Sequence, residues 1–205
     1  MSALFISAFV TFLVVIDPPG CAPIFAGLTR DATAAHRRAM AIRSVLVAAG
    51  ILLFFALLGE ELLNALGVSL SAFRIAGGIM LFLIAIDMVF EKRTERRENR
   101  AEEVAASEVD DVSVFPMAIP MIAGPGSIAS AMLLTARADG LAATAVVLGA
   151  LLAVLVLTLL ALLAAGPLMR LLGHKMEAML TRLLGVILAA LAVQFVLDGI
   201  ERSFS

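Results

Sequence analysis

The sequence contains no Trp and no Tyr, only one Cys and two His, and charged residues make up 16% of its 205 residues. The single cysteine, Cys21, excludes an internal disulfide and any Cys-x-x-Cys redox pair. His36 and His174 both fall in polar segments beside other charges and have no His or Cys partner at helical spacing, so we expect no metal site. A net charge of −2, with no basic patch carrying interleaved aromatics, gives no indication of nucleic-acid binding.

Catalytic and nucleotide-binding motifs are also missing. No histidine lies inside an apolar segment, and neither a Gly-x-Gly-Asp nor a His-Glu-x-x-His pattern occurs, so an intramembrane enzyme would lack its nucleophile–base pair. No phosphate-binding loop occurs either, which argues against direct ATP drive within this chain. We therefore expect neither an enzyme nor a protein that needs a cofactor.

Apolar sequence is what the chain has in excess: it is 62% hydrophobic, with a mean hydropathy of +1.07. A water-soluble chain of this size would need more polar residues to cover its surface. A helix crosses a bilayer in ~20 apolar residues. Six such segments can be drawn: Ala3–Leu28, Met40–Leu58, Ala72–Phe90, Val112–Thr135, Leu141–Met169, and Leu183–Leu197 extended by Met179–Arg182 and Asp198–Ile200. The sequence predicts an all-α, polytopic membrane protein with six transmembrane helices.

Basic residues are distributed unevenly among the connections. The connections that follow the first, third and fifth apolar segments hold most of the Lys and Arg residues. On the opposite face of the membrane the basic residues are only Arg74, Arg137 and Arg202. Since cytoplasmic connections carry the excess of positive charge, both termini are predicted on the non-cytoplasmic, periplasmic side. Residues Met1–Leu28 have no basic start and no small-residue cleavage site, so we expect a retained segment rather than a signal peptide.

Proline and glycine interrupt the first and the fourth segments. The interruptions are Asp17-Pro18-Pro19-Gly20-Cys21-Ala22-Pro23 and Pro120-Met121-Ile122-Ala123-Gly124-Pro125-Gly126-Ser127. Proline removes a helical N–H donor, and freed backbone groups facing lipid cost several kcal/mol, so each break must be buried in protein or line a wet cavity. Where the helices restart, near Gly20-Cys21 and near Gly126-Ser127, free N–H groups can face an anionic group such as a carboxylate.

Asp17 is the most informative side chain, because an ionisable group inside a membrane segment is expensive and by default functional. It could bind a substrate amino group, carry a coupling proton or cation, or cap the restarted helix. Gln194 could be a polar contact in the cavity or an interhelical bond. The predicted substrate-binding residues are Asp17, Pro18, Gly20, Cys21, Pro23, Pro120, Gly124, Pro125, Gly126, Ser127 and Gln194. Arg74, Arg182 and Asp87 are candidates for gating or for structural positions at the membrane interface.

The chain also shows a weak internal repeat. Arg74-Ile75-Ala76-Gly77 is matched by Arg182-Leu183-Leu184-Gly185, and Pro19-Gly20 by Pro125-Gly126 at almost the same spacing. Three crossings per half is an odd number, so the second half must enter the membrane upside down. We expect one membrane domain with inverted three-helix repeats in residues 1–90 and 112–205, joined by a charged, solvated cytoplasmic linker in residues 91–111. Paired breaks in two inverted halves are typical of a transport site.

At these residues the chain resembles the MarC family of six-span bacterial inner-membrane proteins, also described as neutral amino acid transporters. The resemblance is carried by Asp17-Pro18-Pro19-Gly20 with Pro23, Leu70–Gly78, Phe115–Ile128 and Glu177–Ile200. The family usually has Asn-Pro at the first break, where this chain has Asp17-Pro18. The resemblance implies a location in the bacterial inner membrane and movement of small neutral amino acids such as alanine, glycine or serine, with the proton gradient as a candidate driving force.

The preferred interpretation is a secondary transporter of a small zwitterionic solute. The restarted helix ends would hold its carboxylate, Asp17 with backbone carbonyls would hold its ammonium, and the two halves would rock about the site. The expected partners are a neutral amino acid, membrane lipid, a coupling proton or sodium ion and, as a candidate, a second copy of the chain. The alternatives are a cation- or proton-conducting transporter with Asp17 as ion ligand, or an exporter of another small solute.

Overall fold

The computed structural model describes residues 1–105 and 111–204, and all regular secondary structure in these ranges is helical, as predicted. The elements are α1 (Ser2–Ile16), α2 (Pro18–Leu28), α3 (Ala34–Ala65), α4 (Leu70–Val89), α5 (Lys92–Ala105), the π-helical segment η1 (Ser113–Ile122), α6 (Pro125–Thr135), α7 (Leu141–Leu163) and α8 (Ala165–Phe204). Five stretches are long and apolar enough to cross a membrane, with α1 and α2 counting as one. The η1–α6 pair, bent by 54°, makes a sixth if it is one span.

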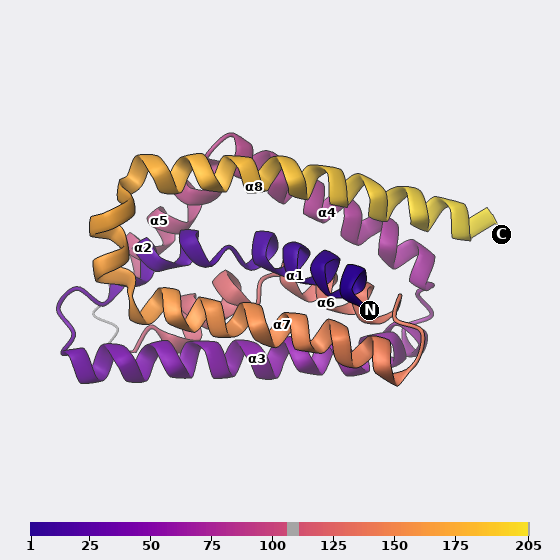
Figure 1. The fold of residues 1–205 in the computed structure, drawn as a ribbon, viewed down its shortest axis with the longest axis horizontal. Coiled ribbons are helices and arrows are strands. Elements are labelled where there is room, and N and C mark those ends of the chain that lie inside the picture. Colours follow the sequence, from indigo (N-terminus) through magenta and orange to yellow (C-terminus); the bar gives the residue numbers. More distant parts are fainter. Residues whose placement is uncertain (106–110, 205) are drawn as a thin grey trace.

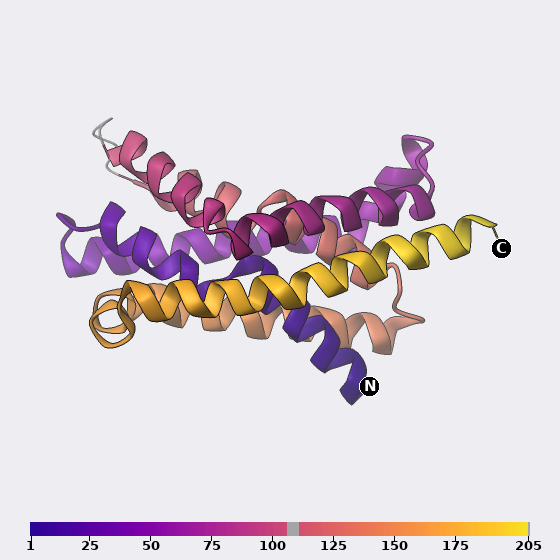
Figure 2. The same ribbon diagram turned by 90° about the horizontal axis from the view of Figure 1, so that it is seen from above.

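The helices form an elongated bundle with most axes along its long direction (Figures 1 and 2). In Figure 1, α4 and α8 run together along the upper edge, α3 and α7 along the lower edge, and α1 with α2 lies between these pairs. Helix α6 and segment η1 pack against α3. Both termini lie toward one end of the bundle, and the α2–α3 and α7–α8 connections lie toward the other (Figure 1). That the end with the termini is periplasmic stays a prediction.

Several helices end at other residues than the apolar segments predicted. Helix α3 begins after Thr33, whose hydroxyl oxygen accepts a hydrogen bond from the His36 N–H, and it extends well beyond Met40–Leu58. Helix α7 ends before the predicted Met169, and α8 starts ahead of Pro167. Proline has no N–H to continue the α7 ladder but is tolerated in the first turn of a helix. The first turns of α8 therefore run across the end of the bundle before the helix follows α4 (Figure 1).

Helices α4 and α8 approach each other closely where each has a glycine facing its partner. A Cβ added to Gly78 would lie 2.8 Å from the Ala192 carbonyl oxygen and 3.0 Å from the Val196 nitrogen. A Cβ added to Gly185 would lie 2.9 Å from Met88 Cβ. Small residues at helix crossings let the backbones approach in a membrane, where van der Waals packing replaces the hydrophobic effect as the source of helix association.

We expect Gly78→Ala to lower the unfolding temperature of the protein, because the new methyl group meets backbone atoms of α8 and overpacking costs ~1–3 kcal/mol. Gly149→Ala is the matched control, since its added Cβ would meet nothing within 4 Å. Cys21 is fully buried, so reaction of its thiol with a fluorogenic maleimide reports unfolding of the detergent-solubilised protein. Equal unfolding temperatures for the two variants would contradict the close α4–α8 contact.

Candidate functional site

The first break places a buried carboxylate between α1 and α2. Asp17 separates the two helices with a left-handed backbone (φ 60°, ψ 65°), a conformation that Asp adopts more readily than most residues. Its Oδ1 accepts a hydrogen bond from the Gly20 N–H at 3.1 Å and so caps α2. Pro18 and Pro19 need no such partner, because proline has no N–H. A Cβ on Gly20 would collide with the Asp17 carboxylate, so glycine leaves the room for this cap.

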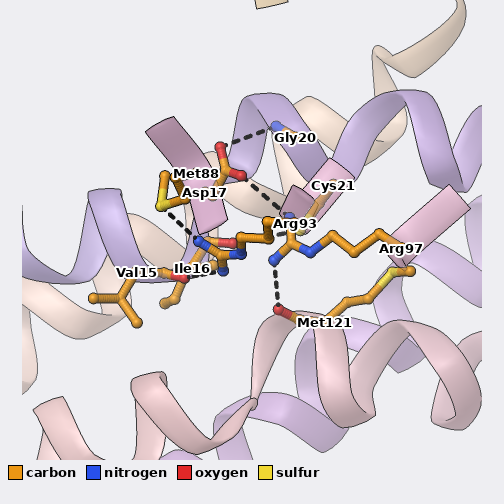
Figure 3. Close-up of polar contacts among 9 residues, drawn as sticks. All are labelled: Val15, Ile16, Asp17, Gly20, Cys21, Met88, Arg93, Arg97 and Met121. Carbon is orange, nitrogen blue, oxygen red and sulfur yellow. Dashed lines mark hydrogen bonds and ion pairs between the residues drawn. The ribbon is translucent and has the colours of Figure 1, made fainter. Parts of the chain in front are cut away.

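Helix α5 brings two arginines to this break (Figure 3). Arg97 donates from Nη1 to Asp17 Oδ2 at 3.1 Å and from Nη2 to the Met121 carbonyl oxygen at 3.3 Å. Arg93 donates from Nη2 to the Val15 carbonyl oxygen at 2.6 Å, and its Nη1 lies 3.0 Å from Met88 Sδ. The side chains of Asp17 and Arg97 are only 1% and 11% exposed, so the ion pair is largely removed from water. Arg97 thereby links the first break to the second.

Burial lowers the pKa of Arg93 to about 10, and the neighbouring charge of Arg97 acts in the same direction. This pKa still lies well above neutral pH. The Arg93 guanidinium therefore remains charged under physiological conditions.

The second break joins an irregular segment to a regular helix. Within η1, Phe115 and Ile119 are extended, with φ −125° and ψ 127° and 124°, because each precedes a proline that disfavours the α conformation. Gly124 occupies the N-cap of α6. A Cβ at Gly124 would lie 2.5 Å from the Pro120 carbonyl oxygen, so the close approach of the chain to itself requires glycine.

A cavity of about 250 Å³ lies between α5 and the second break. Among the described residues it is lined by Val15, Ile84, Asp87, Arg93, Arg96, Arg97, Pro120, Met121, Gly124, Pro125, Gly126 and Ser127. Arg96 pairs with both oxygens of Asp87, at 2.9 and 2.8 Å. Guanidinium groups and the N–H groups at a helix start are both donors suited to anions. The cavity can therefore hold a small anionic group.

The predicted site residues are distributed between this cavity and its surroundings. Six of the sequence candidates line it: Asp87, Pro120, Gly124, Pro125, Gly126 and Ser127. The candidates from the first break do not line the cavity. Asp17 is bound to Arg97, and Cys21 Sγ lies 3.5 Å from the Ile16 carbonyl oxygen. The remaining candidates of this break belong to α2: Pro18, Gly20 and Pro23. Gln194 is elsewhere, on α8, where its Nε2 donates to Asp198 Oδ1 at 2.6 Å.

The two arginines proposed for gating have different surroundings. Arg182 of α8 pairs with Glu91 at the end of α4. Arg74 is 1% exposed, and its Nε and Nη2 have no hydrogen-bond partner among the described residues. Near Gln194, Arg137 pairs with Asp198 and lies over the Phe195 ring, 4.3 Å from its centroid. The two arginines matched in the repeat therefore occupy similar places: Arg74 of α4 lies near Gly199 toward the C-terminal end of α8, and Arg182 of α8 lies near Glu91, just after the C-terminal end of α4.

Sequence reasoning missed Arg93, Arg96 and Arg97 as site residues. Residues 91–111 offer no apolar face and so predict a solvated linker, whereas Arg93 and Arg97 of α5 contact Val15 and Asp17 of the membrane bundle and Arg96 lines the cavity. A signal was available, because these arginines are three and four residues apart and so share one face of a helix that follows directly on α4.

Known proteins similar to this chain are membrane proteins. The family described as "MarC family integral membrane protein" matches residues 2–204. UPF0056 membrane protein MJ1677 of Methanocaldococcus jannaschii is 41% identical over 197 residues, covering 96% of each chain. UPF0056 inner membrane protein YhgN of Escherichia coli is 36% identical over 196 residues, 96% of this chain and 95% of that protein. UPF0056 membrane protein YvbG of Bacillus subtilis is 34% identical over 205 residues, 100% of this chain and 97% of that protein. No solved structure matches the chain.

We expect Arg97→Gln to destabilise the protein strongly, because it leaves the Asp17 charge buried without its cation, and breaking a buried pair costs ~3–5 kcal/mol. Arg96→Gln is the matched control: the same change removes a pair whose arginine side chain is 68% exposed. Exposed pairs contribute only ~0–1 kcal/mol. Thermal melts followed by helical circular dichroism in detergent would measure the difference, and equal losses in the two variants would show that the Asp17–Arg97 contact is not a buried pair.

Proposed function

The chain belongs to the MarC family of integral membrane proteins, and on that basis we propose that it is a secondary transporter of small neutral amino acids across the bacterial inner membrane. The cavity at the η1–α6 junction carries this proposal, since it is lined by residues of α1, α4, α5, η1 and α6. Interrupted membrane helices are tolerated where they line a cavity. Drug-sized pockets hold ~300–1,000 Å³, so a cavity of about 250 Å³ suits a smaller solute such as alanine, glycine or serine.

In this proposal residues 1–90 and 112–205 form inverted repeats, and helix packing supports the assignment. Helix α1 contacts α7 as η1 contacts α3, α2 contacts α7 as α6 contacts α3, and α4 contacts α8. A pseudo-two-fold axis in the membrane plane would relate such pairs. The aligned glycines do not extend this match, because a Cβ on Gly77 would meet Ala129 and Leu133 of α6, whereas a Cβ on Gly185 would meet Ala85 and Met88 of α4. Rocking of one half against the other would expose the cavity to each side of the membrane in turn. Both termini would lie on the periplasmic side.

The solute carboxylate would lie at the start of α6 and face the arginines of α5. Asp17 would act behind this position, since it is bound to Arg97, which lines the cavity, and does not line the cavity itself. Separation of Arg97 from Asp17 and from the Met121 carbonyl oxygen would release α5 from both breaks together. We therefore assign the contacts of Arg97 with Asp17 and Met121 as the gate on the α5 side. Arg74 and Arg182 would have structural positions at the ends of the α4–α8 pair.

A second candidate function is a cation or proton pathway through Asp17, and the burial of this carboxylate favours it. Its two oxygens already accept hydrogen bonds from Gly20 and Arg97, which argues against a vacant cation site. Export of another small solute through the same cavity is a third candidate.

We expect the purified protein in proteoliposomes to catalyse counterflow of labelled alanine, glycine or serine. Gly126→Leu should reduce it at least tenfold, because Gly126 lines the cavity and an added Cβ already approaches Ile84 Cδ1 at 2.7 Å. Gly149→Leu is the same change at an exposed position of α7 and should leave counterflow unchanged. Circular dichroism melts identify any variant that has lost its fold. Absence of counterflow for every small neutral amino acid in the unmodified protein would refute the substrate assignment.

Asp17→Asn separates the first two candidate functions. An Asn oxygen can still accept from Gly20 or Arg97, so we expect a folded protein that retains solute flux. If Asp17 carries the coupling proton, the dependence of uptake on an imposed pH gradient should disappear. Uptake measured at several pH gradients decides this, and unchanged flux with unchanged pH dependence would exclude Asp17 as the coupling site.

A further inference from the structure

We propose that the cavity recognises its solute by the carboxylate alone, through Arg93 and the start of α6, so that small monocarboxylates such as 2-hydroxy acids bind there as amino acids do. The inference rests on the proposed function and deepens it by naming which end of the solute is read. It follows from the charges and the free donors around the cavity.

The described charges around the cavity leave one cation without an acidic partner. Asp87 is bound by Arg96, and Asp17 is bound by Arg97. The contacts of Arg93 with the described residues are both neutral, the Val15 carbonyl oxygen and Met88 Sδ (Figure 3). A guanidinium has five N–H donors, so donors of Arg93 remain for a ligand. One carboxylate entering the cavity would balance this charge.

The start of α6 adds donors to the same cavity. Pro125 has no N–H, and the Ile128 N–H donates to the Gly124 carbonyl oxygen at 3.0 Å. The free amides of this first turn are therefore those of Gly126 and Ser127, and both residues line the cavity. No side chain caps this end of α6 among the described residues. Two backbone donors and a guanidinium in the lining of one cavity are suited to binding a carboxylate.

An ammonium group finds no equivalent in the same cavity. The acidic side chain in its lining, Asp87, is paired with Arg96 through both of its oxygens, and the remaining described lining is cationic, apolar or glycine, proline and serine. A second positive charge would add to that of Arg93. Val15, Ile84 and Met121 offer apolar contacts for a short alkyl chain. The carboxylate is therefore required, while the amino group is replaceable by a hydroxyl.

The test is equilibrium binding of labelled L-lactate to the purified protein in detergent. We expect lactate to bind, L-alanine to displace it, and L-alaninamide, which lacks the carboxylate, to fail at tenfold higher concentration. Arg93→Gln should weaken lactate binding at least tenfold, and Arg93→Lys, which keeps the charge, should recover part of the loss. Arg43→Gln is the matched control, since Arg43 pairs with Asp111 outside the cavity and is largely exposed.

Three results of this binding test would overturn the inference: no lactate binding, displacement by alaninamide as effective as by alanine, or unchanged binding in an Arg93→Gln variant that melts normally.

An anionic lipid headgroup presents the same single charge, so phosphatidylglycerol is added as a further competitor. Displacement by this lipid but not by alanine would assign the site to lipid and also overturn the inference. Lactate binding without any counterflow would refute transport alone, whereas alanine counterflow without lactate binding would refute the carboxylate site alone.

Discussion

The ion pair between Asp17 and Arg97 is the contact on which the arrangement of the site depends. A carboxylate at a helix break inside the bundle has lost most of its hydration, and the loss is tolerable only if its charge and lone pairs are met by the protein. Gly20 meets one oxygen through its N–H, and Arg97 meets the other through its guanidinium. Because Arg97 comes from α5, satisfying the break also fixes a charged helix against the membrane bundle.

The position of α5 in turn determines the chemistry of the cavity. Arg97 also donates to the Met121 carbonyl oxygen, so one side chain contacts both helix breaks. Arg93 precedes Arg97 by one helical turn and lies on the same face of α5. Without α5, the described lining would be the start of α6, one acidic side chain and apolar groups. With it, the lining combines guanidinium groups with the backbone amides at the start of α6. A polar connection thus supplies the electrostatics that the apolar spans cannot.

The features of the fold and the site that could be predicted from the sequence are those caused by residues close together in the chain. Helices of spanning length could be predicted because side chains that face lipid must be apolar along the whole crossing, and the breaks could be predicted because proline removes a backbone donor wherever it falls. The cap by Asp17 is also local. The docking of α5 is not, because Arg97 and Asp17 are 80 residues apart and nothing in either segment specifies the other. The extended residues in η1 and the use of Gly124 as cap depend on how the second break folds onto itself, which composition does not specify.

The distance along the chain between Asp17 and Arg97 also constrains how these positions can evolve. A single substitution to an apolar residue at either one strands the opposite charge, so paired loss must pass through a poorly folded intermediate. Asparagine at position 17 is a milder single change, since its amide oxygen can still accept a hydrogen bond from Arg97, but it leaves the guanidinium without an opposing charge. A lineage that exchanges the carboxylate for the amide therefore keeps this contact in one step and leaves a cation that an anionic ligand can balance.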